Sequence, residues 1–196
     1  SNVDSACYES DLKYFRWNTV LDFQGKDETL LHTITDRKEH QPEAISYYKD
    51  ASKTETTDSC SNFGSLQAIK VVKRNQSGVI LELELDFQNG AVSVQSEYNM
   101  RAILGCGITN INLLDGSSVE MSILPSAYIS IQAKGDGTYA VLGGGYGHGI
   151  GMSQNGAQKL CGQGFDYKRI LNYFYQDTEL TELYQPQNVT KEEGGA

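Results

Sequence analysis

Apolar and polar positions alternate along the middle of the chain, which predicts strands with one solvated face. In residues 81–86 three leucines alternate with three acidic residues, a period of two. Asn89-Gly90 follows directly and predicts the tight turn of a β-hairpin. The expected strands are 14–23, 66–73, 79–87, 91–95, 119–124, 128–134, 139–142 and 179–184, with a loop over 49–62 and a turn at 135–137.

Four segments show helical rather than alternating spacing of their apolar residues. Ser96 and Asp166 precede two of them and are expected to act as N-caps. The expected helices are 26–39, 96–104, 153–160 and 167–175. The pattern therefore predicts an α+β fold, with a largely antiparallel β-sheet or barrel-like core and a few short helices, two of them near the C-terminus.

Composition and charge narrow the classes of partner. The 196 residues carry 16 Lys and Arg against 25 Asp and Glu, a net charge of −9, which argues against a nucleic-acid partner. No apolar run approaches the roughly 18 to 20 residues of a membrane span. We expect one domain over residues 1–184, a flexible tail over 185–196, and a neutral or weakly charged partner.

Tyrosine and cysteine usage each leave two interpretations open. The 12 tyrosines outnumber the 6 phenylalanines, as in proteins that stack on sugar rings but also in ordinary β-sheets. The cysteines are far apart in the sequence, with no paired spacing typical of zinc sites. They are expected to be buried small apolar residues or to form one or two disulfides. The four are Cys7, Cys60, Cys106 and Cys161.

A glycine-rich segment, Gly143–Ala157, is the most informative part of the chain. It holds seven glycines, which permit positive φ and a close approach of the backbone to a ligand. It lacks the Gly-Lys-Ser/Thr of a P-loop and no βαβ unit surrounds it, so nucleotide binding is not expected. His148 lies between two glycines, where its imidazole either binds the loop backbone or contacts a ligand and handles protons.

Several motifs in this region resemble those of a known family. Gly145-Tyr-Gly-His-Gly-Ile-Gly-Met-Ser-Gln-Asn-Gly-Ala157, followed by a helix ending in Tyr173-Phe-Tyr175 and by Asp177-Thr-Glu-Leu180, resembles the signature of the stage II sporulation protein D family, the SpoIID/LytB domain. Upstream, the segments 100–105 and 124–126 resemble the Arg-x-x-Leu-Gly and Pro-Ser elements of that family, and Trp17 also fits. The similarity extends over about residues 97–184, and more loosely over 14–96.

The resemblance implies a peptidoglycan lytic transglycosylase of sporulation and engulfment, which acts on glycan strands stripped of their peptides. In that chemistry a carboxylic acid protonates the glycosidic oxygen, and the 6-hydroxyl of the sugar closes an anhydro ring. It further implies an extracytoplasmic place at the cell wall or intermembrane space, an N-terminal membrane anchor in the full-length protein, and other cell-wall hydrolases as partners. Some relatives hold zinc, but the Cys and His positions here form no recognisable ligand set, so no cofactor is expected.

The candidate substrate-binding residues follow from these motifs, and most keep a structural alternative. Ser153 and Gln154 are predicted to contact sugar groups. The alternative for Ser153 is that its hydroxyl caps a helix. Arg101 either contacts an acidic lactyl group or pairs with a nearby carboxylate. Tyr173 and Tyr175 are sugar platforms or pack the end of a helix. The full set is Tyr146, Gly147, His148, Gly149, Ser153, Gln154, Tyr173, Tyr175 and Arg101.

The catalytic residue stays unassigned. In the family it is a Glu on an N-terminal helix of the Glu-Ala-Leu-Lys-Ala-Gln-Ala type, which this sequence lacks, so the family acid is expected upstream of residue 1. Glu97 and Glu120 are acids without a role. Three hypotheses remain: the substrate-cleft part of a transglycosylase, inactive by itself; a non-catalytic wall-binding or amidase-modifying module; and an unrelated binder of small ligands.

Overall fold

The computed structural model describes residues 9–181 of the chain. The chain divides into two compact units, residues 1–150 and 151–196, and each is described by itself. The tail predicted over 185–196 lies outside the described residues, and the single domain over 1–184 stays a prediction. All the strands that the structure describes belong to the first unit, in two antiparallel sheets that do not close into a barrel.

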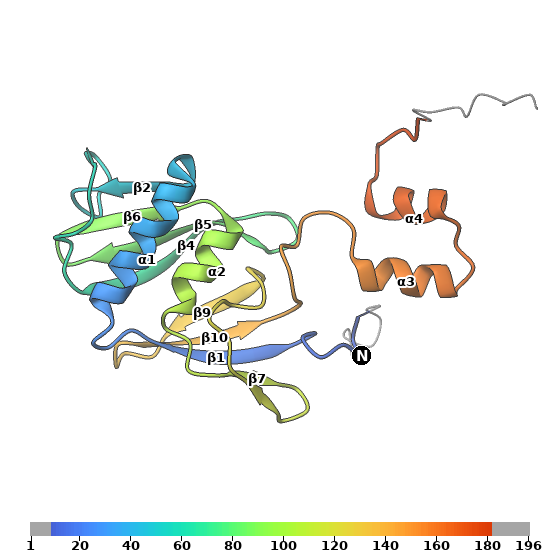
Figure 1. Ribbon diagram of the computed structural model, residues 1–196, viewed down its shortest axis with the longest axis horizontal. Coiled ribbons are helices and arrows are strands. Elements are labelled where there is room, and N and C mark those ends of the chain that lie inside the picture. Colours follow the sequence, from blue (N-terminus) through green and yellow to red (C-terminus); the bar gives the residue numbers. More distant parts are fainter. Residues whose placement is uncertain (1–8, 182–196) are drawn as a thin grey trace, which may run out of the picture. The chain divides into compact units, whose positions relative to one another are not determined.

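The first sheet joins the beginning of the chain to the segment before the glycine-rich loop. Its strand order is β8-β7-β1-β10-β9, so β1 lies between β7 and β10 (Figure 1). The register places Trp17, at the start of β1, opposite Gly143, at the end of β10. The strands are β1 (Trp17–Asp22), β7 (Ile111–Leu113), β8 (Ser118–Val119), β9 (Ile129–Ala133) and β10 (Thr138–Gly143).

The second sheet contains the predicted hairpin and has the order β3-β2-β6-β5-β4. Its central pair, β5 and β6, turns at Asn89-Gly90, as the sequence predicts. Along β5 the leucines Leu83 and Leu85 are fully buried in the core, and Glu84 and Asp86 lie on the opposite face. The two carboxylates are also buried, at 4% and 8% exposed, so the solvated face that the sequence predicts is wrong here. The strands are β2 (Ile45–Tyr48), β3 (Thr56–Thr57), β4 (Leu66–Arg74), β5 (Ile80–Phe87) and β6 (Gly90–Val94).

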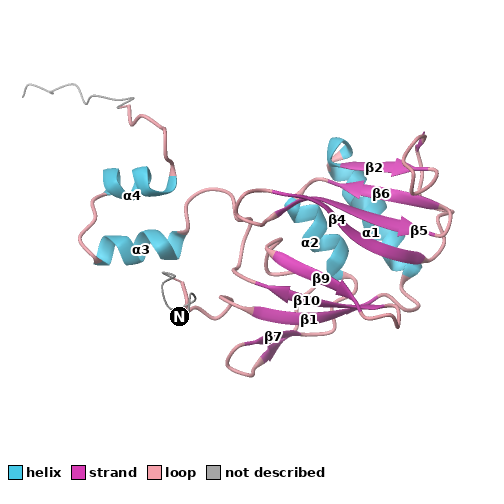
Figure 2. Cartoon of the chain, turned by 180° about the vertical axis from the view of Figure 1, so that it is seen from behind, coloured by secondary structure: helices cyan, strands magenta, loops and turns pink. Residues whose placement is uncertain are grey.

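Two helices cover one face of the second sheet, with a short 3-10 turn, η2 (Pro42–Ala44), between the first of them and β2. The helix α1 (Asp27–His40) buries Leu30 and Ile34, and α2 (Glu97–Gly105) is capped by the hydroxyl of Ser96. Both lie on the same side of the sheet in the two views (Figures 1 and 2). The α+β class is therefore confirmed.

The second unit contributes two short helices with side-chain caps. The helix α3 (Gln154–Gly162) begins after Ser153, whose hydroxyl accepts from the amide of Gly156, and α4 (Tyr167–Phe174) begins after Asp166 in the same way. The cap at Asp166 was expected from the sequence, and the cap at Ser153 was one of the two alternatives for that residue. The two helices near the C-terminus are thus confirmed.

Three expectations about strands were wrong or incomplete. Only Val119 of the predicted strand 119–124 lies in a strand; the following residues pack across the end of α2, where Gly105 leaves room for the carbonyl of Ser122. Residues 179–181 form no strand, and 182–184 lie outside the described residues. The loop over 49–62 contains the short strand β3, and β2 and β7 were not predicted.

The structure tests the expectations about the cysteines and about membrane-spanning segments. Cys60 is buried, Cys106 is partly buried and Cys161 is exposed, and none of the three forms a disulfide among residues 9–181. Cys7 lies outside that range. No helix in the described part of the chain has both the length and the apolar character needed to span a membrane.

Candidate functional site

The glycine-rich loop starts from a close contact with the single tryptophan. Trp17 is 3% exposed, and a Cβ at Gly143 would lie 2.2 Å from Cζ2 of its indole ring. No residue larger than glycine fits there without displacing the ring. The indole Nε1 donates to the carbonyl of Gly145 at 3.1 Å. The tryptophan therefore fixes both the end of β10 and the first residues of the loop.

A second set of bonds holds the loop from the segment before β9. The hydroxyl of Ser126, which is 5% exposed, donates to the carbonyl of Gly144 at 2.7 Å. The amide of Gly147 donates to the carbonyl of Pro125 at 2.9 Å, and the amide of Gly144 donates to the carbonyl of Tyr128 at 3.0 Å. Residues 143–149, named here the glycine turn, are thus held mainly by backbone carbonyls and amides.

Arg101 connects α2 to this support. Its guanidinium Nε donates to the carbonyl of Leu124 at 2.8 Å, and the amide of Leu124 donates back to the carbonyl of Arg101 at 3.2 Å. Its Nη1 lies 3.1 Å from Oε2 of Glu97. Of the two alternatives for Arg101, the structure contains the carboxylate pair; contact with a lactyl group stays a prediction. Glu97, an acid without an assigned role, is the partner in that pair.

Alternate glycines give the glycine turn its shape. Gly145, Gly147 and Gly149 have φ values of 76°, 121° and 71°, in the region that side chains rarely adopt. At Gly145 and Gly147 a Cβ would meet nothing within 4 Å, so the backbone conformation and not lack of space requires glycine. The residues between them, Tyr146 and His148, are both exposed.

The imidazole of His148 makes one hydrogen bond among the described residues. Its Nδ1 accepts from the amide of Ile150 at 2.8 Å. In a neutral imidazole this bond leaves the proton on Nε2, which can then donate to a ligand oxygen. The two interpretations of His148 are therefore compatible, because one nitrogen binds the loop and the other is exposed to solvent.

Exposed aromatic rings surround the glycine turn. Tyr146 is 66% exposed and stacks on Tyr14, with ring centroids 4.8 Å apart and planes tilted by 35°. Tyr128 is 46% exposed, and its ring borders Gly144. Sequence reasoning missed Tyr14 and Tyr128, which lie far from the glycine motif in the chain. The excess of tyrosine was the signal present, but it does not select individual positions.

The second unit carries the other predicted residues. The hydroxyl of Ser153 caps α3 at 3.0 Å from the amide of Gly156, and Gln154 is exposed. The hydroxyl of Tyr175 accepts from the amide of Met152 at 3.0 Å. The ring of Tyr173 packs on Phe174 with centroids 5.1 Å apart. These contacts fit the structural alternatives, and sugar contacts by the same residues stay predictions.

The structure brings part of the predicted set together. Tyr146, Gly147, His148 and Gly149 share one turn in the first unit, and Arg101 supports it through Leu124 and the adjoining Pro125-Ser126. Among residues 9–181 no three His, Cys, Asp or Glu side chains are placed to hold a metal ion. The arrangement offers aromatic faces and a proton donor, which suit a neutral ligand rich in hydroxyl groups.

Two proteins of Bacillus subtilis (strain 168) are similar to parts of this chain. Amidase enhancer is 34% identical over 89 residues, which is 45% of this chain and 12% of that protein. Stage II sporulation protein D is 36% identical over 76 residues, which is 38% of this chain and 22% of that protein. The chain therefore spans less than a quarter of either relative.

These similarities place the chain in a class and then in a family. The class is that of α+β domains with the SpoIID/LytB signature, since both relatives support the resemblance found in the motifs. A family model described as a domain of unknown function, DUF8618, matches residues 36–151, more than half of the chain. The chain belongs to that family.

Proposed function

We propose that this chain is the glycan-contacting part of a cell-wall protein of the sporulation type, a lytic transglycosylase acting on glycan strands stripped of peptides. The observation that carries the proposal is the glycine turn, which presents His148 and Tyr146 to solvent from a rigid support. The names of the two relatives, Amidase enhancer and Stage II sporulation protein D, agree with a role at the cell wall during sporulation.

In this proposal the residues of the turn bind and orient the sugar. Tyr146, backed by Tyr14, provides a flat apolar surface for a pyranose ring. The Nε2–H group of His148 donates a hydrogen bond to a ring or glycosidic oxygen. Sugar contacts by Ser153, Gln154, Tyr173 and Tyr175, which belong to the second unit, are a separate part of this proposal. The acid that protonates the leaving oxygen is not assigned to any of these residues.

The location and partners follow from the same proposal. The substrate is extracytoplasmic, so the protein acts at the cell wall or in the intermembrane space and is anchored to the membrane as a full-length protein. Its partners are glycan strands and other cell-wall hydrolases. No cofactor is required, because the sugar itself supplies the attacking hydroxyl.

Sedimentation with bead-linked glycan strands stripped of peptides tests this binding. We expect His148→Ala to weaken binding about tenfold, because a hydrogen bond to the sugar is lost. His32→Ala, at an exposed position on α1, is the matched control and should bind as the unaltered chain does. Equal binding by both variants would show that His148 only supports the loop.

A product assay tests the expected lack of activity. We expect residues 1–196 to release no anhydro sugars from stripped glycan strands, because no catalytic acid is assigned among them. Mass spectrometry of the soluble products measures this directly. A clear anhydro product would contradict the expectation and would require an acid within this chain.

Modification of an amidase is a second candidate, favoured by the match to Amidase enhancer. In this case the chain would bind the wall or the amidase without cleaving glycan. The measurement is the rate at which a purified cell-wall amidase releases peptides from sacculi, with and without the chain. A faster rate with no anhydro product supports this second function over the first.

A further inference from the structure

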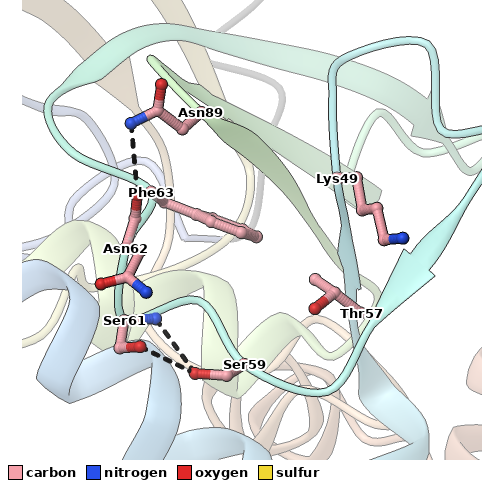
Figure 3. Close-up of a pocket in the computed structure, with 7 residues that line it drawn as sticks. All are labelled: Lys49, Thr57, Ser59, Ser61, Asn62, Phe63 and Asn89. Atoms are coloured by element: carbon pink, nitrogen blue, oxygen red, sulfur yellow. Dashed lines mark hydrogen bonds between the residues drawn. The ribbon is translucent and has the colours of Figure 1, made fainter.

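A cavity of about 360 Å³ lies in the first unit, among residues that the glycine turn does not use. Its volume is at the lower end of the range for small-molecule sites, roughly 300–1,000 Å³. One side is the hairpin of β2 and β3, and the other is the segment 59–63 with the turn at Asn89 (Figure 3). We name this cavity the hairpin pocket; its lining residues are Lys49, Thr57, Ser59, Ser61, Asn62, Phe63 and Asn89.

One wall of the hairpin pocket is rigid. Phe63 is 4% exposed and packs against the buried rings of Tyr47 and Phe87. The amide of Asn89 donates to the carbonyl of Phe63 at 2.9 Å, and its side-chain Nδ2 donates to the carbonyl of Asn62 at 3.3 Å. These bonds fix the segment 62–63 against the β5–β6 turn before any ligand is bound.

The opposite wall is held by ion pairs on the hairpin. Lys49 pairs with Glu55 across the hairpin, and the amide of Lys49 donates to the carbonyl of Glu55 at 2.9 Å. Lys53, at the tip, pairs with the buried carboxylate of Glu84 on β5. Since the charge of Lys49 is balanced by Glu55, the lining of the hairpin pocket has no unbalanced charge.

The polar groups of the pocket are neutral, and three of them have open bonding positions. Among the described residues, Oγ1 of Thr57, the side-chain amide of Asn62 and Oδ1 of Asn89 make no hydrogen bond. Hydroxyl and amide groups both donate and accept, which matches the hydroxyl and acetamido groups of a neutral amino sugar. An anion would need an unbalanced cation, which this lining lacks.

We propose that the hairpin pocket binds one neutral N-acetylated sugar ring, a second glycan site separate from the glycine turn. The amides of Asn62 and Asn89 pair with the acetamido group, and Thr57 binds a ring hydroxyl. The proposal rests on the proposed function for the source of the sugar, which is the N-acetylglucosamine of a glycan strand. It assigns a role to the segment 49–63, which the glycine motif leaves unexplained.

Titration with chitotriose, a neutral oligomer of N-acetylglucosamine, tests the proposal. We expect the NMR amide signals of Thr57, Asn62 and Asn89 to shift, and Thr57→Val to weaken binding about three- to tenfold through loss of one hydrogen bond. Thr56→Val is the matched control, because Thr56 is the neighbour on β3 and does not line the pocket. Equal affinities for the two variants would overturn the proposal.

Two other ligands, cellotriose and inorganic phosphate, test whether the pocket recognises the acetamido group or only hydroxyl groups or anions. Cellotriose has the hydroxyls but lacks the acetamido groups, and we expect it to bind at least fivefold more weakly. Inorganic phosphate should cause no shift at Thr57 or Asn62, and a phosphate-dependent shift there would make this an anion site. Cellotriose binding as tight as chitotriose would overturn the acetamido assignment.

The failures of the two proposals are distinguishable. If chitotriose shifts the NMR signals of residues 145–150 alone and sedimentation depends on His148, the sugar site in the hairpin pocket is wrong and the proposed function stands. Shifts at the hairpin pocket, without any sedimentation on the bead-linked glycan strands, would contradict the proposed function and support a sugar site alone.

Discussion

The glycine turn and the hairpin pocket belong to the same unit but are stabilised in different ways. The glycine turn is held mainly by backbone groups, a buried indole and one buried hydroxyl. The hairpin pocket has one wall attached through Lys53 and Glu84. The stability of the glycine turn should therefore depend little on pH and salt, whereas the stability of the hairpin pocket should depend on both.

The largest expected effect is at the tryptophan under the glycine turn. Trp17→Ala removes a fully packed ring and its bond to Gly145, and we expect a loss of about 3–5 kcal/mol in the free energy of unfolding. Denaturant unfolding measures this. Trp17→Phe, which keeps a ring in the core, should cost clearly less. A loss below about 1 kcal/mol for the alanine variant would show that the contact of Trp17 with the glycine turn contributes little to stability.

An intermediate effect is expected at the hydroxyl that binds the turn. Ser126→Ala leaves the buried carbonyl of Gly144 without its donor, and we expect a loss of about 1–2 kcal/mol. The loss should be the same at pH 7 and pH 4, since neither group titrates. Ser130→Ala, at an exposed position on β9, is the control and should stay within about 0.5 kcal/mol of the unaltered chain.

The smallest effect on the free energy of unfolding is expected at the β2–β3 hairpin, and it should depend on pH. Burial raises the pKa of Glu84, but hydrogen bonds from Lys53 and Lys70 lower it by more, so the net pKa lies below the ordinary value of 4.5. A carboxylate with a lowered pKa stabilises the fold above its unfolded pKa, and this stability is lost as the pH falls through the folded value. Lys53→Gln removes one of the two lysines.

We therefore expect Lys53→Gln to be less stable than the unaltered chain at pH 7, with the difference shrinking as the pH falls well below 4.5. Denaturant unfolding at a series of pH values measures it. Lys73→Gln, an exposed lysine with no ion pair among the described residues, should show no such change. A difference that stays constant down to pH 3 would show that Lys53 does not act through the charge of Glu84.

Local patterns predicted most of the regular elements. The Asn89-Gly90 turn and the caps Ser96 and Asp166 are local signals, and the structure confirms each. The alternation over 81–86 predicted the strand correctly but not a solvated face, because Glu84 pairs with Lys53 and Lys70 and is only 4% exposed. The strand expected over 119–124 failed because Leu124 bonds to Arg101 on α2 and not to a neighbouring strand. Apolar residues in such a segment satisfy a tertiary contact that periodicity does not describe.

The candidate site could be predicted only in part. The exposed position of His148 follows from flanking glycines, and its local hydrogen bond was one of the two interpretations. The support by Trp17 and Tyr14 depends on pairing between β1 and β10, more than 100 residues apart in the chain. The support by Ser126 is a tertiary hydrogen bond to Gly144, which no periodicity describes. The hairpin pocket gave no sequence signal, because serine, threonine and asparagine in a loop are expected whether or not a cavity is present.

The position of Trp17 has a practical consequence. It is the chain's sole tryptophan, and its indole nitrogen is attached to the glycine turn. Intrinsic fluorescence of the unlabelled protein is therefore an optical reporter of that loop. Opening of the loop would admit water to the indole and shift its emission to the red, whereas events confined to the β2–β3 hairpin would leave the spectrum unchanged.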